Sequence, residues 1–291
     1  DGVQIELLDS IKPLPGLIVH KGKVREGLIT TGDSLTLQID KPNRQKTALN
    51  HSATHLLHAA LKEVLGEHIK QAGSLVASDR LRFDYTHFSP LTAKERRRIE
   101  ALVNEKIREN IQITTKEMEI EDALKEGAMA LFGEKYGDRV RVVSVPGFSK
   151  ELCGGTHVSA TGDIGLFRII SEGGIASGVR RIEAVTGGTA YEKVYSEYES
   201  LAAIRSILKA PTNEELAKVK KLLEKNRELE KEVTSLKEKM LSGNDSSSED
   251  DIQTMGDASL LIKNLENTDS KTLRTYIDNA KNKLKSGIVV A

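Results

Sequence analysis

The sequence of 291 residues predicts an α+β protein built from four successive regions, and three observations carry this prediction. Apolar residues alternate with polar ones in the first forty residues, a helical period begins near Asn50, and strand-like segments return beyond residue 80. Beyond Pro211, apolar residues recur three and four apart. We therefore expect a small β-barrel subdomain, an α+β domain with an antiparallel sheet and helices, a coiled-coil helix, and a linker with part of a C-terminal domain, over residues 1–45, 46–210, 211–241 and 242–291.

Composition excludes several classes of protein before any motif is considered. The 43 basic and 43 acidic side chains cancel, which argues against a protein that coats nucleic acid through net charge. The aromatic content of 4%, without tryptophan, argues against a platform that stacks many bases. A single cysteine excludes a disulfide scaffold, and no apolar run reaches the roughly 18 residues of a membrane span. With no secretory signal, we expect a cytoplasmic protein with a reduced thiol.

The first region is predicted to contain short strands joined by tight turns. The alternation of apolar residues that begins at Val3 is broken by the turn sequence Pro13–Gly16, and a later alternation of Leu35, Leu37 and Ile39 ends near Pro42. Short strands with tight turns favour a small barrel or a meander.

Three helices and several strands are expected in the second region. Asn50 is a plausible N-cap for a helix that ends at Gly66, and Thr92 with Glu95 forms a capping box for a second helix. The apolar face of this second helix consists of Ile99, Leu102, Val103 and Ile107. A third helix is expected over residues 191–208, and strands over residues 81–83, 111–115, 140–145, 167–170 and 179–185. Helices packed on an antiparallel sheet make an α+β domain.

The third region shows about three heptads of a coiled-coil seam. The seam residues are Val219, Leu222, Asn226, Leu229, Val233, Leu236 and Met240. Two interpretations remain open, a long helix that folds back on a neighbour in the same chain and a helix that pairs with a second copy. We expect a mobile linker over residues 242–251, then a helix over 272–284 and a strand over 288–291.

Two histidines on the first helix form one half of a candidate metal site. His51 and His55 are four positions apart, which on a helix corresponds to about 40° of rotation and 6 Å of rise, so both imidazoles leave the same face. Position 52 is serine, so the glutamate of the H-E-x-x-H motif is missing. His58 lies on the same face and is a possible competing ligand, whereas His20, His68 and His87 have no partner at ligand spacing.

The second half is the segment that begins at the only cysteine of the chain. Cys153 precedes His157 by four positions, and the two glycines between them allow the backbone to turn sharply. A thiolate and three imidazoles form a tetrahedral donor set that suits zinc. Either half alone is compatible with residues that bind no metal, but the two halves together predict a zinc site formed by His51, His55, Cys153 and His157.

Further polar residues favour a catalytic over a purely structural ion. Gln71 is a candidate for such a role, and the glycine-rich segment 173–178 permits a close approach of the backbone to a ligand. Arg180 and Arg181 follow it and suit phosphate groups. The motifs G-x-x-x-x-G-K-[ST] and G-x-S-x-G are absent from the sequence, so neither a P-loop ATPase nor a serine hydrolase is supported.

The pair of metal motifs resembles the editing domain of alanyl-tRNA synthetase, related to editing domains of free-standing alanyl-tRNA deacylases and of threonyl-tRNA synthetase. The resemblance covers residues 1 to about 210, including the segments 50–58, 71–76, 81–84 and 171–176. The region from Leu273 to Val290 resembles the start of the C-terminal, tRNA-binding domain of that synthetase. Nothing resembles the class II aminoacylation domain, where ATP and alanine would bind. Together with the first residue, Asp1, this indicates an excised fragment with an incomplete barrel. A homodimer through the C-terminal region is a separate, possible expectation.

The resemblance implies hydrolysis of serine or glycine from mischarged tRNA(Ala). In this interpretation zinc is held by the four residues above, Cys153 is the weak or displaceable ligand, and Gln71 orients water or the amino acid. Gly173, Gly174, Arg180 and Arg181 would bind the 3′ end of the substrate. Two alternatives remain, a free-standing alanyl-tRNA editing protein and a tRNA-binding or dimerisation module with a structural zinc ion.

Overall fold

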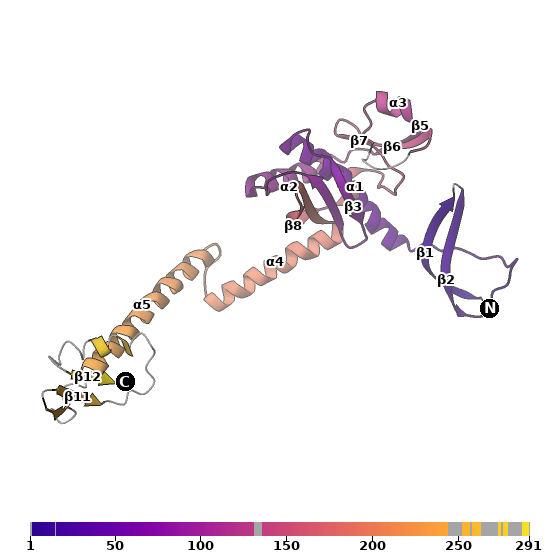
Figure 1. Cartoon of the computed structure of the whole chain (residues 1–291). Coiled ribbons are helices and arrows are strands. Elements are labelled where there is room, and N and C mark those ends of the chain that lie inside the picture. Colours follow the sequence, from indigo (N-terminus) through magenta and orange to yellow (C-terminus); the bar gives the residue numbers. More distant parts are fainter. Residues whose placement is uncertain are drawn as a thin grey trace. The chain divides into compact units, whose positions relative to one another are not determined.

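The computed structural model describes residues 2–14, 16–130, 136–243, 252–256, 258–262, 273–274, 276–278 and 287–290 (Figure 1). The chain divides into two compact units, Asp1–Lys193 and Val194–Ala291, which are considered separately below.

The main core of the first unit lies between a four-stranded sheet and two helices. The sheet has the strand order β3-β4-β9-β8 and all its pairings are antiparallel. Its strands are β3 (Gln71–Val76), β4 (Leu81–Thr86), β8 (Phe167–Ala176) and β9 (Val179–Thr186). Alternate residues of β4, among them Phe83, are fully buried against apolar side chains of α1 (Lys41–Leu65) and α2 (Ala93–Arg108). The predicted α+β class is confirmed.

Helix α1 begins ten residues before the predicted position. Its N-cap is Asp40, whose carboxylate accepts a hydrogen bond from the backbone N–H of Asn43 at 3.0 Å, and Pro42 occupies the first turn. Asn50 is therefore not a cap. Its buried amide donates to the carbonyl of Ala77 at 2.7 Å and accepts from the hydroxyl of Thr186 at 2.7 Å, which joins α1 to the rest of the core. The predicted end of the helix at Gly66 is confirmed.

Helix α2 agrees with the sequence prediction in its cap and in its buried face. The backbone N–H of Glu95 donates to the Thr92 hydroxyl at 3.2 Å, and the Glu95 carboxylate accepts from the backbone N–H of Thr92 at 2.8 Å. The four predicted apolar residues of α2 are all buried.

A second, three-stranded antiparallel sheet has the order β5-β6-β7. It is formed by β5 (Thr114–Glu119), β6 (Arg139–Val145) and β7 (Ser149–Leu152). Together with the short helix α3 (Ile120–Lys125) it encloses a small apolar cluster around Val142 and Leu152. β5 begins three residues later than predicted, and neither β3 nor β7 was predicted. The 3-10 helix η1 (Thr161–Ile164) follows this sheet in the chain.

The described part of the first region forms no closed barrel, and of the small barrel or meander expected there it contains one hairpin. The first forty residues form one antiparallel hairpin, β1 (Gln4–Leu14) with β2 (Leu17–Glu26). The segment from Gly27 to Asp40, which the structure describes throughout, contains no strand. Leu35, Leu37 and Ile39 do alternate as in a strand, but their side chains are exposed, and without a neighbouring strand an alternating segment forms no sheet.

The second unit contains two helices and a small sheet. Helix α4 (Gly187–Leu208) runs from the first unit into the second, and an ion pair of Arg205 with Glu215 joins it to α5 (Glu215–Gly243). The predicted helix in each of these regions is confirmed. A mixed sheet of order β10-β11-β12 combines β10 (Ile252–Met255), β11 (Ala258–Ile262) and β12 (Gly287–Val290).

Two predictions for the C-terminal region fall largely outside the described residues. The expected linker is one of them, since residues 244–251 are not described. The expected helix 272–284 is the other, although its described residues 273–274 and 276–278 are helical. The strand expected at the end of the chain is β12. Among the described residues, no helix has the length and apolar character that a membrane crossing would require.

Candidate metal centre

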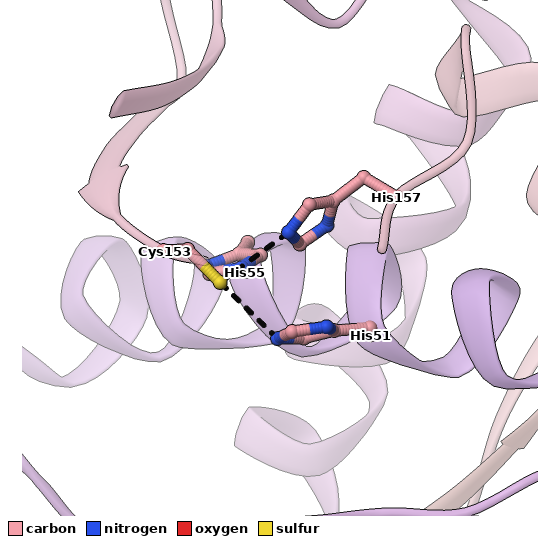
Figure 2. A group of neighbouring side chains, drawn as sticks. All are labelled: His51, His55, Cys153 and His157. Atoms are coloured by element: carbon pink, nitrogen blue, oxygen red, sulfur yellow. Dashed lines mark hydrogen bonds between the residues drawn. The ribbon is translucent and has the colours of Figure 1, made fainter. Parts of the chain in front are cut away.

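Four side chains from two distant parts of the chain meet beside α1. His51 and His55 project from α1, Cys153 follows β7 directly, and His157 lies in the loop between β7 and η1 (Figure 2). One potential ligand atom from each of these residues lies within 4.8 Å of the other three. The predicted convergence of the two halves is therefore observed.

The spacing of these atoms matches a tetrahedral zinc site. The Cys153 Sγ lies 3.4 Å from His51 Nε2 and 3.3 Å from His157 Nε2. Zinc–sulfur and zinc–nitrogen bonds of about 2.3 and 2.0–2.1 Å at tetrahedral angles place the two ligand atoms about 3.5 Å apart. The fourth donor, His55 Nε2, is buried and has no hydrogen-bond partner. A ligand atom left without a partner in an otherwise bonded cluster fits a metal ion, and the donor set suits zinc.

Glu151 lies behind His55, and the sequence analysis missed it. Its carboxylate accepts hydrogen bonds from His55 Nδ1 at 2.7 Å and from His58 Nδ1 at 3.0 Å. A His55 ring that donates from Nδ1 presents the lone pair of Nε2 to the cluster, which is the tautomer that binds a metal. The one signal in the sequence was that Glu151 precedes Cys153 by two positions, so that both would leave the same face of an extended strand.

The loop that carries Cys153 and His157 is fixed to α1 and to β6. The hydroxyl of Ser52 accepts from the backbone N–H of Val158 at 3.1 Å and lies 3.4 Å from His157 Nδ1. Arg141 of β6 donates to the carbonyls of Gly154 and Gly155. A Cβ atom at Gly155 would lie 1.9 Å from Cε1 of His51, so only glycine lets the loop approach α1 this closely.

The charges of the metal-free cluster are set by these contacts. Burial alone would raise the pKa of Cys153, but hydrogen bonds from His157 and His51 lower that pKa to about 3, so the sulfur is a thiolate. Burial alone would lower the pKa of His55, but the Glu151 carboxylate raises it to about 10. Burial would raise the pKa of Glu151, and the attraction of His55 lowers it overall. A metal ion that binds here must displace the proton of His55 but meets a sulfur that is already ionised.

The other predicted site residues are not bonded to the four-residue cluster. Gln71 lies at the start of β3 and its amide is 3.4 Å from the Ser74 hydroxyl. Gly173 and Gly174 lie within β8 rather than in a loop, opposite Arg181 and Arg180 of β9.

Both arginines proposed for phosphate binding already form ion pairs with acidic residues. Arg180 pairs with Glu172, and Arg181 donates to both carboxylate oxygens of Asp84 at 2.7 and 2.9 Å. Any phosphate contact of Arg181 would therefore compete with a two-point ion pair.

The remaining histidines lie outside the cluster. His58 is buried and its Nδ1 contacts Glu151, so it is not placed as a competing ligand. His68 Nε2 lies 3.0 Å from His87 Nδ1 near the surface, and His20 Nδ1 lies 2.7 Å from the Ser10 hydroxyl.

Comparison with known proteins finds a family match that includes two of the four cluster residues. Residues 140–183, which include Cys153 and His157, match the family described as the threonyl and alanyl tRNA synthetase second additional domain. The segment that carries half of the cluster is therefore similar to this second additional domain.

Similarity over the whole of this chain then points to one kind of synthetase. The chain is 47% identical over 291 residues to the alanine–tRNA ligase of Desulfosudis oleivorans and 49% identical over 290 residues to that of Shewanella amazonensis. It is 48% identical over 289 residues to the alanine–tRNA ligase of Xanthomonas axonopodis pv. citri. These matches cover 99–100% of this chain and 33% of each relative, so the chain spans about a third of their length. The resemblance to alanyl-tRNA synthetase is confirmed over the whole chain.

Proposed function

We propose that this chain carries the editing activity of an alanyl-tRNA synthetase, the zinc-dependent hydrolysis of Ser-tRNA(Ala) and Gly-tRNA(Ala). The observation that supports it most directly is the convergence of His51, His55, Cys153 and His157 at the spacing of a zinc site. The match of residues 140–183 to the second additional domain and the relatives named alanine–tRNA ligase support the same proposal.

The four cluster residues would hold the metal with unequal strength. His55 is buried and anchored by Glu151, whereas His51, Cys153 and His157 are partly exposed. We therefore assign Cys153, at the start of the glycine loop, as the ligand that gives up its place when substrate or water enters. Zinc, when bound, would supply Lewis acidity toward a water molecule or the amino group of the substrate.

Selectivity for serine over alanine would depend on the cost of leaving polar groups of the editing site without hydrogen-bond partners. An aminoacylation site that activates alanine rejects glycine weakly, because one missing methyl group changes the binding free energy by only about 1–3 kcal/mol. The same site does not fully exclude serine. An editing site that hydrogen-bonds the serine hydroxyl would leave polar groups unpaired when alanine enters.

Gln71 is our candidate for orienting water or the amino acid. Gly173, Gly174, Arg180 and Arg181 are our candidates for the 3′ end of the tRNA.

The test compares Ser-tRNA(Ala) with Ala-tRNA(Ala) as substrates of the purified chain. We expect release of serine and retention of alanine, with about one equivalent of zinc per chain. Cys153→Ala and Gln71→His should both slow the release of serine, and near-normal rates in both would contradict these two roles. Less than about half an equivalent of zinc in carefully prepared protein would contradict the metal site.

A second candidate function is a tRNA-binding or dimerisation module with a structural ion. Its support is that the cluster and the bond from Val158 to Ser52 tie α1 to a loop about a hundred residues later. In that case chelation should unfold the protein, whereas an ion needed for hydrolysis should be removable with the fold retained.

The remaining expectations belong to the same proposal. They are a cytoplasmic location, tRNA(Ala) as the partner, an editing domain over residues 46–210 and a homodimer through the C-terminal region. The free-standing editing protein stays an alternative. It predicts that this chain alone hydrolyses mischarged tRNA as fast as a longer protein that contains the chain.

A further inference from the structure

We propose that Glu151 and His58 are positioning residues that hold the His55 ring in the tautomer and orientation needed to bind the metal. This inference rests on the metal site of the proposed function and adds two residues that do not touch the ion. It deepens that function by explaining how one ligand of the cluster is prepared.

The carboxylate of Glu151 uses its two oxygens for two different histidines of α1. Oε2 lies 2.7 Å from His55 Nδ1, and Oε1 lies 3.0 Å from His58 Nδ1. An ionised carboxylate only accepts hydrogen bonds, so each imidazole must donate from Nδ1. Since His55 and His58 lie on successive turns of one helix, a single buried side chain from β7 fixes both rings.

The consequence for His55 is a prepared ligand atom. With the proton on Nδ1, the lone pair of Nε2 points toward the cluster, where it has no hydrogen-bond partner. A buried polar atom without a partner costs free energy, and a metal ion held by the cluster would supply the missing partner. A carboxylate behind a metal-binding histidine fixes the ring and makes the ligand nitrogen more basic.

The role of His58 is to hold the second oxygen of Glu151. The His58 ring is buried beside Phe83, with 5.3 Å between ring centroids, and its Nδ1 is engaged with Oε1. The hydroxyl of Ser149 adds a bond to the same oxygen at 3.3 Å. With Oε1 fixed by these two donors, the carboxylate cannot rotate away from His55.

Charge distinguishes this positioning role from a purely structural one. Glu151 is 1% exposed, and burying a carboxylate is costly unless it is compensated. A divalent cation bound by His55 would compensate this buried charge. We therefore expect a neutral replacement of Glu151 to weaken metal binding more than it weakens the fold.

The experiment measures zinc affinity by competition with a chelator, and the melting temperature of the metal-free protein, on the full chain. Glu151→Ala should lower zinc affinity about 10- to 100-fold. Glu151→Gln, which keeps the size and one acceptor, and His58→Phe should each lower it about tenfold, the lower end of that range. The matched control is Glu100→Gln. Glu100 is a partly buried carboxylate that pairs with Arg168 away from the cluster, so its replacement should leave zinc affinity unchanged.

The outcomes separate this inference from the proposed function. If the unaltered chain neither binds zinc nor hydrolyses Ser-tRNA(Ala), the proposed function itself fails. If the unaltered chain does both, and Glu151→Gln and His58→Phe keep its zinc affinity, the positioning role is overturned while the function stands. If Glu151→Ala does not fold, the other two variants still decide. A drop in zinc affinity in Glu100→Gln equal to that in Glu151→Gln would also overturn it.

Discussion

Helices α1 and α5 are the two longest described helices, with 25 and 29 residues, and their surroundings differ completely. α1 contributes twelve buried residues, whereas no described side chain of α5 is buried. The apolar seam of α5 is about half exposed at Leu222, Leu229, Val233 and Leu236. A helix enclosed by a sheet, a second helix and a loop can hold two imidazoles in fixed positions. An exposed seam offers only a surface, and the candidate metal site accordingly lies on α1.

The largest expected effect of a single substitution tests the enclosed helix. His55→Ala removes a buried ligand and leaves the Glu151 carboxylate with one histidine, so we expect loss of zinc binding and a destabilisation of about 3–5 kcal/mol. Zinc content after dialysis and urea-induced unfolding measure the two effects. Retained zinc at full stoichiometry would show that His55, the buried candidate ligand of α1, does not hold the ion.

A pair of leucine truncations tests the packing difference directly. Leu57 of α1 is fully buried, so Leu57→Ala should lower the free energy of unfolding by about 2–5 kcal/mol. Leu229 of α5 is 47% exposed, so Leu229→Ala should change it by less than about 0.5 kcal/mol. Urea titrations of both variants give the comparison, and equal losses would mean that the seam is covered in solution.

Alanine substitutions at the adjacent Gly154 and Gly155 test how closely the loop between Cys153 and His157 approaches α1. A methyl group at Gly155 would overlap the His51 ring, whereas one at Gly154 would meet nothing within 4 Å. Gly155→Ala should therefore lower zinc affinity about tenfold or more, the lower end of what a lost positioning contact costs. Gly154→Ala is the matched control and should leave it unchanged. Competition with a chelator measures both, and similar affinities for the two variants would contradict the steric argument.

The four residues of the candidate metal site could be predicted from the sequence because each half of the set is local. Four residues along a helix fix the relation of His51 to His55, and a short glycine turn fixes that of Cys153 to His157. Glu151 and Ser52 could not be assigned in this way. Their partners lie about a hundred residues away, and no periodicity encodes a contact across that separation.

The errors in the predicted fold also arise where a local pattern does not encode the structure. Alternation in residues 35–39 indicates an extended segment but not a neighbouring strand, so a closed barrel could not be inferred from it. The start of α1 was missed because residues 41–47 carry no apolar side chain at helical spacing, although Asp40 and Pro42 are typical of a helix N-terminus. The capping box of α2 was predicted correctly because both of its hydrogen bonds are made within three residues.

The smallest expected effect concerns the polar residue within the α5 seam. Asn226 is exposed and its amide donates to Glu230 of the same helix at 2.7 Å, so Asn226→Ala should change the free energy of unfolding by less than about 0.5 kcal/mol. A seam that pairs with a second copy would behave differently, because a polar residue at such a position specifies register at a cost in stability. Replacing Asn226 would then raise the melting temperature and make it depend on protein concentration. Melting curves of both proteins at two concentrations a hundredfold apart distinguish an unpaired seam from one that a second copy covers.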